Sequence, residues 1–257
     1  MTIVAAVKVR DGLILGTDSM TQISQGTQLV KSYSNARKLF QILDRPIAVA
    51  TYGLGNIGQR SIEGIVLDFC QTEDAHAGSV EGVARGLYQF VRPLYDSEFQ
   101  NVPPDEQPVL GFYMGGYSEG GSPFPEEFEI VLPLAGDPSR ARAADQFGAG
   151  WRGIGAPFTR LYKGWDPMLR ERLASQGMSA TDIDALLDGL ETPVVYDGMP
   201  VQDAVNFCTF ILDTTIGFTT YHWGAPSCGY PLQLATILAD VGFEWVARLE
   251  LRVSRYA

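Results

Sequence analysis

The residues with the most informative chemistry stand at the start of the chain, where Thr2 follows Met1. We expect no leader segment before them. Removal of Met1 by an aminopeptidase exposes Thr2, whose hydroxyl and free α-amino group together form the nucleophile and base of threonine-type acyl transfer. The alternative is an ordinary β-branched strand residue behind a retained methionine.

Three later residues favour the chemical interpretation. Asp18 follows an apolar run and Lys38 precedes one, so neighbouring strands would bring both beside Thr2. A lysine there favours the deprotonated hydroxyl, and an aspartate keeps that lysine charged and oriented. Gly53 ends another apolar run where we expect a helix to begin, and its N–H is suited to a developing oxyanion. Taken singly, these residues fit a turn, a surface lysine and a steric glycine.

Apolar, β-branched runs must position these groups, and they predict four antiparallel strands at the start of the chain. An Asp-Gly pair joins the first two and is a strong hairpin signal. A polar stretch, residues 19–34, separates them from the other two. The predicted strands cover residues 2–9, 12–17, 38–42 and 47–51.

Beyond Gly55 the apolar residues recur near helical spacing, which predicts two helices of roughly 15–20 residues each joined by a loop at 71–78. Sheets and helices segregated in this way predict an α+β fold with two sheets packed face to face and helices outside. Further strands are expected at 109–117, 128–132, near 145–148, 232–238 and 243–252, and further helices after 157, at 180–190 and at 201–217.

Composition bounds the protein class. The chain has 257 residues, enough for one large domain, and 46% of them are hydrophobic. No apolar run reaches the ~18 residues of a spanning helix, and no secretory signal is seen. The net charge of −11 disfavours a nucleic-acid or anionic-membrane partner. We therefore expect a soluble, cytoplasmic protein.

Cysteines and histidines predict neither a disulfide framework nor a metal site. The three cysteines fit buried thiols in a reducing compartment, and the two histidines lie in no ligand pattern. We expect no cofactor. The cysteines are Cys70, Cys208 and Cys228, and the histidines are His76 and His222.

Four segments together resemble the N-terminal signature of proteasome β-type subunits, which the bacterial HslV and Anbu proteins share. They are Thr2-Ile3-Val4, the strand end at Asp18, the run 38–42 and the run 50–53. Order and spacing match over roughly the first 60 residues, apart from about four extra residues between Asp18 and Lys38. The resemblance implies an N-terminal nucleophile (Ntn) hydrolase fold, a four-layer αββα sandwich of two antiparallel sheets.

The resemblance also implies a role for each residue. Thr2 would be the nucleophile and its own amine the base, Lys38 would tune Thr2, Asp18 would support Lys38, and the Gly53 N–H would form the oxyanion hole. A substrate cleft would be lined by Thr21, Gln22 and Thr51.

Later segments match this family less well. The glycine-rich turn near Gly155 carries Ile154 where the family has a serine, and Gly224 stands where it has an aspartate. Ser227 occupies the position of a second accessory serine. Residues 162–194 look like a helical insertion in a single domain, 1–257.

Other candidate sites are weaker. Ser19 has no histidine near it in sequence, and the glycines at 53, 55 and 58 spell GxGxxG without the βαβ context of dinucleotide binding. The aromatic cluster 221–223 favours buried packing over ligand contact.

The leading hypothesis is a threonine-type peptidase that cleaves peptide or protein substrates inside a ring or spiral of identical subunits, with an ATPase unfoldase as a possible partner. The missing accessory residues motivate an alternative, a proteasome-like scaffold subunit with little proteolysis. A third hypothesis is an Ntn amidase or transpeptidase, because all of these enzymes use the same acyl-transfer core.

Overall fold

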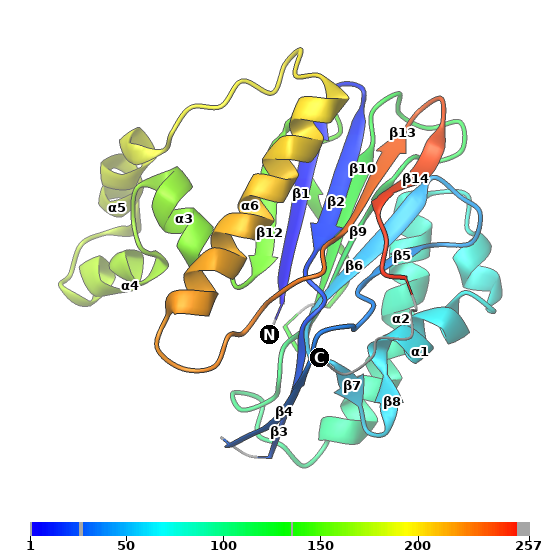
Figure 1. Cartoon of the computed structure of the whole chain (residues 1–257), viewed down its shortest axis with the longest axis horizontal. Coiled ribbons are helices and arrows are strands. Elements are labelled where there is room, and N and C mark those ends of the chain that lie inside the picture. Colours follow the sequence, from blue (N-terminus) through cyan, green and yellow to red (C-terminus); the bar gives the residue numbers. More distant parts are fainter. Residues whose placement is uncertain (1, 26–27, 135, 251–257) are drawn as a thin grey trace.

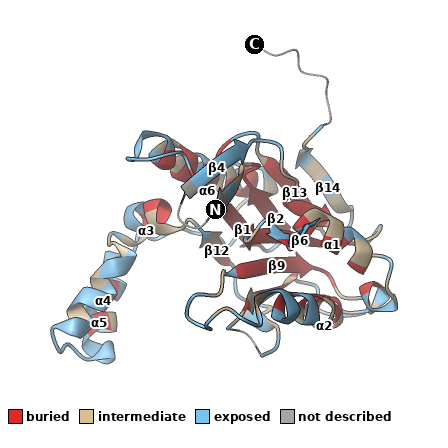
Figure 2. Cartoon of the chain, turned by 90° about the horizontal axis from the view of Figure 1, so that it is seen from below, coloured by how far each residue is buried: buried red, intermediate tan, exposed pale blue. Residues whose placement is uncertain are grey.

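The computed structural model describes residues 2–25, 28–134 and 136–250. Two five-stranded antiparallel sheets lie face to face, with helices on both outer faces (Figures 1 and 2). The predicted α+β, four-layer αββα sandwich is confirmed. Among the described residues, no helix is long and apolar enough to cross a bilayer.

The first sheet has β1 (Ile3–Val9) near its centre, hydrogen-bonded to β12 (Gly148–Gly153) on one side and β2 (Gly12–Thr17) on the other. The Asp-Gly turn joins β1 and β2 as predicted. Two further strands follow in the order β12-β1-β2-β13-β14, namely β13 (Gln233–Leu238) and β14 (Gly242–Ala247). Because both faces of β1 are covered, its sequence is an almost continuous apolar run.

The second sheet has the order β11-β10-β9-β6-β5. Within the described residues its edge strand β5 pairs only with β6, and β6 pairs with β9 on its other side. The strands are β5 (Leu39–Gln41), β6 (Ile47–Gly53), β9 (Leu110–Gly116), β10 (Glu126–Leu132) and β11 (Ser139–Arg142).

Three apolar clusters hold the layers together. One lies between the sheets, a second between the first sheet and the helices α3 and α6, and a third between the second sheet and α1 and α2. Residues alternate along β1, so Val4 and Ala6 face the other sheet while Ile3 and Val7 face α6. These helices are α1 (Ile62–Phe69), α2 (Val80–Phe99), α3 (Ala156–Lys163) and α6 (Val201–Tyr221).

The segment after α3 carries two shorter helices, α4 (Pro167–Ser175) and α5 (Ala180–Leu187). Figure 2 shows them extending away from the sandwich. Ile183 and Leu187 are the buried residues of α5, whereas α4 buries none of its own. This placement agrees with a peripheral segment; that residues 162–194 are an insertion stays a prediction.

Several strand predictions were wrong. Six strands, rather than the predicted four, lie between Ile3 and Gly53. The two additional strands lie in the polar stretch 19–34 and are β3 (Thr21–Gln25) and β4 (Gln28–Tyr33). These two form their own two-stranded sheet and expose apolar residues such as Val30 and Tyr33, so they lack the alternation of a half-buried strand. The strand near 145–148 is β12, which starts later and is rich in glycine, and β11 was missed.

The predicted boundaries after Gly53 also need correction. The chain does not turn into a helix there: two short strands come first, β7 (Asn56–Ile57) and β8 (Arg60–Ser61), turning at Gly58 with a φ of +56°. Helix α1 therefore has only 8 residues, and Ser61 caps it by accepting a hydrogen bond from Gly64 N.

The chain after α6 differs from prediction as well. The aromatic cluster is exposed, with Tyr221 91% and Trp223 96% accessible. The last strand, predicted to reach residue 252, ends at Ala247, and residues 251 and 252 lie outside the described residues.

A polar layer crosses the space between the sheets. Glu127, fully buried on β10, accepts hydrogen bonds from Tyr113 (2.8 Å) and from Arg142 (2.7 Å). The guanidinium supplies the positive charge that this carboxylate needs away from water.

We predict that Arg142→Met lowers the free energy of unfolding by about 3–5 kcal/mol, because it removes the close ion-pair partner of the buried Glu127 carboxylate. Denaturant unfolding at one fixed protein concentration measures this loss. The matched control is Arg85→Met, which breaks an exposed i,i+4 pair with Glu81 and costs below about 0.5 kcal/mol. Equal losses in the two variants would contradict the prediction.

Candidate active site

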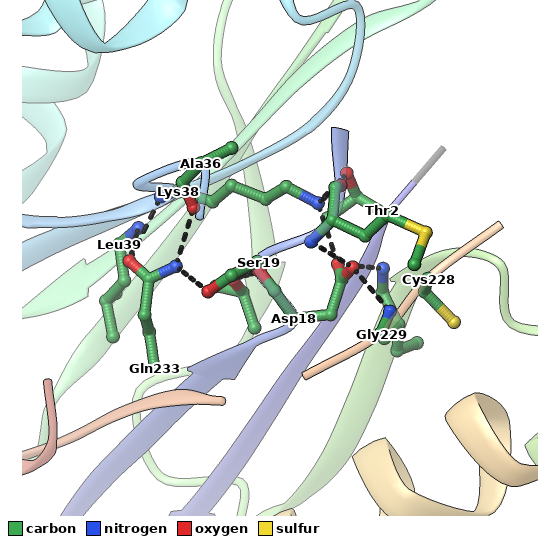
Figure 3. Close-up of polar contacts among 12 residues, drawn as sticks. Thr2, Asp18, Ser19, Ala36, Lys38, Leu39, Cys228, Gly229 and Gln233 are labelled. Atoms are coloured by element: carbon green, nitrogen blue, oxygen red, sulfur yellow. Dashed lines mark hydrogen bonds and ion pairs between the residues drawn. The ribbon is translucent and has the colours of Figure 1, made fainter. Parts of the chain in front are cut away.

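Thr2, Asp18 and Lys38 meet at one end of the first sheet (Figure 3). Lys38 Nζ lies 2.8 Å from Thr2 Oγ1 and 2.8 Å from Asp18 Oδ1. All three side chains are buried, although they come from three segments of the chain. Strand pairing explains the meeting, because β1 and β2 are neighbours and β5 lies in the facing sheet.

The ammonium of Lys38 has a complete set of partners. It donates to Thr2 Oγ1, to Asp18 Oδ1 and to the carbonyl oxygen of Met20. An ammonium has three N–H donors and no acceptor, so this arrangement uses every one of them. The Thr2 oxygen accepts this bond, which leaves its own hydroxyl proton free for transfer to a base.

The carboxylate of Asp18 is equally well satisfied. Besides Lys38, it accepts backbone N–H bonds from Ile3 (3.2 Å), Met20 (2.9 Å) and Gly229 (3.1 Å). These donors lie on β1, at the exit of β2 and before β13. The fully buried carboxylate therefore links three parts of the first sheet and fixes the position of Lys38 relative to Thr2.

Burial lowers the pKa of Lys38 below its ordinary value of 10.5, because the charged ammonium loses its contact with water. The charge of Asp18 and its hydrogen bond oppose this shift. Asp18 is thus the neighbour that does most to keep Lys38 charged, and the pKa of Lys38 is sensitive to it.

Thr2 lies at the end of β1 and is held by its own backbone. Its carbonyl oxygen accepts a hydrogen bond from Ile154 N at 2.9 Å. Gly153 has a φ of +77°, and a Cβ there would lie 2.0 Å from the same carbonyl oxygen. Only glycine fits so close to the main chain of Thr2. Met1 lies outside the described residues.

A pocket of about 190 Å³ opens beside Thr2. Gly53 is part of its wall, with a φ of +86°, and a Cβ there would lie 2.1 Å from the carbonyl oxygen of Val109. The predicted cleft residues Thr21, Gln22 and Thr51 also line this pocket. The structure therefore gathers Thr2, Lys38, Gly53 and the three cleft residues around one cavity.

Thr51 has an unusual hydroxyl. Its Oγ1 is buried and has no hydrogen-bond partner among the described residues. A buried hydroxyl without a partner costs free energy that a bound polar group can recover. Gln22, by contrast, uses its side-chain amide to donate to Pro226 O at 2.8 Å.

The accessory positions differ in what they offer. Ser227 is buried two residues before Gly229, but among the described residues no hydrogen bond joins it to Thr2. Ile154 packs against the apolar cluster around α6, and Gly224 is exposed with open space around its Cα. Neither side chain supplies a polar group to Thr2.

Several residues that contact the site were missed by sequence reasoning. Met20 and Gly229 contact the site through backbone atoms, and such contacts cannot be predicted from the residue type. Gln233 was detectable, because it is a long polar residue at the start of a mostly apolar strand. Among the described residues, no three His, Cys, Asp or Glu side chains are grouped to hold a metal ion.

Comparisons at the sequence level found no matching family model and no similar curated protein. Solved structures do match. An Anbu helical assembly from Pseudomonas aeruginosa gives a TM-score of 0.62 at 18% identity, covering 96% of this chain and 88% of that one. The chain has the fold of the Anbu proteins.

Two other structures of that group agree with this assignment. Anbu (ancestral beta-subunit) from Yersinia bercovieri matches with a TM-score of 0.57 at 16% identity, covering 95% of this chain and 86% of that one. A Gly-1 mutant of Anbu from Hyphomicrobium sp. strain MC1 gives 0.60 at 17% identity, with 96% and 87% covered. This is a proteasome-like Ntn-hydrolase fold, and identities this low establish the fold alone.

We predict that Asp18→Asn lowers the pKa of Lys38 further, because it removes the negative charge of Asp18, the largest of the effects that raise this pKa. Trace acetylation at a series of pH values, read by mass spectrometry, measures the fraction of free amine at Lys38. Lys163 on the surface serves as the internal reference. The control Asp96→Asn on α2 leaves the pKa of Lys38 unchanged, and an unchanged value in Asp18→Asn would refute the ion pair.

Proposed function

We propose that this chain is a threonine-type peptidase that cleaves peptide bonds through an acyl-enzyme on Thr2 after Met1 has been removed. The observation that carries the proposal is the 2.8 Å contact between Lys38 Nζ and Thr2 Oγ1, beside a pocket that Thr2 and Gly53 both line. A cation at this distance stabilises negative charge on the attacking oxygen.

The proposed reaction begins at the Thr2 hydroxyl. The α-amino group of Thr2 takes the hydroxyl proton, directly or through a water, while Oγ1 attacks the substrate carbonyl carbon. The Lys38 ammonium offsets the charge on Oγ1, and the Gly53 N–H offsets the charge on the carbonyl oxygen. The amine then returns the proton to the leaving nitrogen as the C–N bond breaks, which leaves an ester on Thr2.

Hydrolysis of that ester completes the cycle. A water gives one proton to the same α-amino group and attacks the ester carbonyl carbon. When the C–O bond breaks, Oγ1 takes the proton back and the acid product leaves. The base exists only with a free Thr2 amine, so retention of Met1 abolishes this route.

Substrate contacts are proposed for Thr21, Gln22 and Thr51. Thr51 Oγ1, which is buried without a partner, would bond to a polar group of the bound peptide. The substrate is a peptide or protein, without nucleic-acid or membrane partners. We further propose that identical subunits assemble into a ring or spiral in the cytoplasm, with an ATPase unfoldase as a possible partner. The helical assembly of the Pseudomonas aeruginosa Anbu complex supports assembly of this kind.

One observation favours the alternatives. Ile154 and Gly224 give the Thr2 amine no polar side chain, so two of the groups that could orient the base are missing among the described residues. A scaffold subunit with little proteolysis fits this loss. An Ntn amidase or transpeptidase fits the same acyl-transfer groups with another acceptor or substrate.

We predict that intact mass measurement finds the chain without Met1, and that an N-terminal-threonine-directed epoxyketone adds once per chain, at Thr2. Both groups of Thr2 are needed to form the adduct, so Thr2→Ala prevents it. The matched control Thr236→Ala, on β13, labels like the unchanged protein. A Met1-free chain that is not labelled would overturn catalysis and favour the scaffold.

Peptide cleavage separates the peptidase from the amidase. A library of unblocked and blocked peptides, analysed by mass spectrometry, is expected to give internal cleavage that depends on Thr2. Labelling without cleavage of any peptide would instead support an amidase acting on another amide.

A further inference from the structure

Gln233 is fully buried, and its side chain lies between the two sheets beside the proposed active site (Figure 3). Its Oε1 accepts hydrogen bonds from Lys38 N (3.1 Å) and Leu39 N (3.4 Å). Its Nε2 donates to Ser19 Oγ (2.7 Å) and to Ala36 O (2.9 Å). The amide thus uses two acceptor and two donor positions, its full capacity.

These four bonds join the two segments that must meet for the site to form. Ser19 directly follows Asp18, and residues 36–39 contain Lys38. The main chain supports the same contact, because Ala36 N donates to Ser19 O at 2.9 Å. Gln233 therefore fixes the main chain of the lysine relative to the main chain of the aspartate.

The need for such a support follows from the position of Lys38 in its sheet. It directly precedes β5, a strand of three residues at the sheet edge that pairs with β6. Thr51 N donates to Lys38 O at 2.9 Å on that paired side. No strand among the described residues lies on the other side, and Gln233 reaches that side from β13 of the facing sheet.

A lysine side chain has four flexible carbons, so a displaced main chain changes where its ammonium lies. Lys38 Nζ can donate to its three acceptors at the same time only when the main chain of Lys38 is fixed in position. Other residue types fail at position 233. Leucine offers no hydrogen bond, and glutamate lacks the donor for Ala36 O while adding a buried negative charge.

We propose that Gln233 is a positioning residue that holds Lys38 in register with Asp18 and Thr2 across the two sheets. Its effect on catalysis rests on the proposed function, whereas its effect on Lys38 does not. Gln233 acts through Lys38 and does not itself reach Thr2.

Two readouts test this role in the full chain. The first is the rate of epoxyketone addition to Thr2, and the second is the pKa of Lys38 from trace acetylation. The chain has four lysines, so the Lys38 peptide is readily resolved from those of Lys8, Lys31 and Lys163.

Gln233→Leu is expected to slow epoxyketone addition about 100-fold, the size of effect that a misplacement of about 1 Å produces. It also raises the pKa of Lys38 toward 10.5, because the loosened segment admits water. The control is Ile237→Ala, on the same strand and face, whose buried side chain lies in the cluster between the sheets. Each protein is measured at the same number of degrees below its own melting temperature. Under these conditions Ile237→Ala is expected to keep the wild-type rate of epoxyketone addition and the wild-type pKa of Lys38.

Milder variants decide the matter if Gln233→Leu does not fold. Gln233→Glu keeps the acceptor for Lys38 N and loses both donors, and Ser19→Ala removes one hydrogen bond only. We expect slower addition in both, with the larger effect in Gln233→Glu. Variants that match Ile237→Ala in rate and in the pKa of Lys38 would overturn the proposal.

The two proposals fail in different ways. If the unchanged, Met1-free chain does not react with the epoxyketone, the proposed function falls. The pKa of Lys38 then still shows whether Gln233 holds this lysine in place, because that measurement needs no reaction at Thr2.

Discussion

The ion pair between Lys38 and Asp18 is the interaction on which the rest of the site depends. Taking both charges out of water is costly, and the pair persists because its hydrogen bonds are complete on both sides. The fold supplies those partners from strand ends and turns that are distant in sequence. The outcome is a cation held against a hydroxyl, which few arrangements of a flexible lysine would give.

A second carboxylate between the sheets, that of Glu129, also receives hydrogen bonds from distant strands. Tyr52 donates to Glu129 at 2.6 Å, and Arg152 donates to the same carboxylate at 2.6 Å. These residues come from β6, β10 and β12, and so bridge the two sheets directly beside Gly53 and Gly153. Polar contacts between sheets have directions that apolar packing lacks, so they set the register of one sheet on the other. Both glycines that shape the site are next to such a bridge.

Much of this architecture was predictable from local pattern. The strands β1 and β2, the long helix α2 and the meeting of Asp18 with Lys38 follow from apolar runs and an Asp-Gly turn. The β3–β4 hairpin was not predictable in the same way, because its apolar residues are exposed and no buried face imposes a period on them. Strand β12 was placed too early, because glycine fills half of its positions and leaves few side chains to mark a period. The support from Gln233 depends on which strand lies opposite β5, and this is a property of the assembled sheets.

The location of Thr2 next to β1 affects how often local opening of the structure disturbs the site. β1 is hydrogen-bonded on both sides and covered on both faces, so it is among the segments least able to open by itself. Thr2 directly precedes this strand, and its carbonyl oxygen accepts a hydrogen bond from Ile154 N, so its main chain is anchored to the sheet. Local opening therefore rarely disturbs Thr2, and the contact of its side chain with Lys38 lasts as long as the sandwich stays folded.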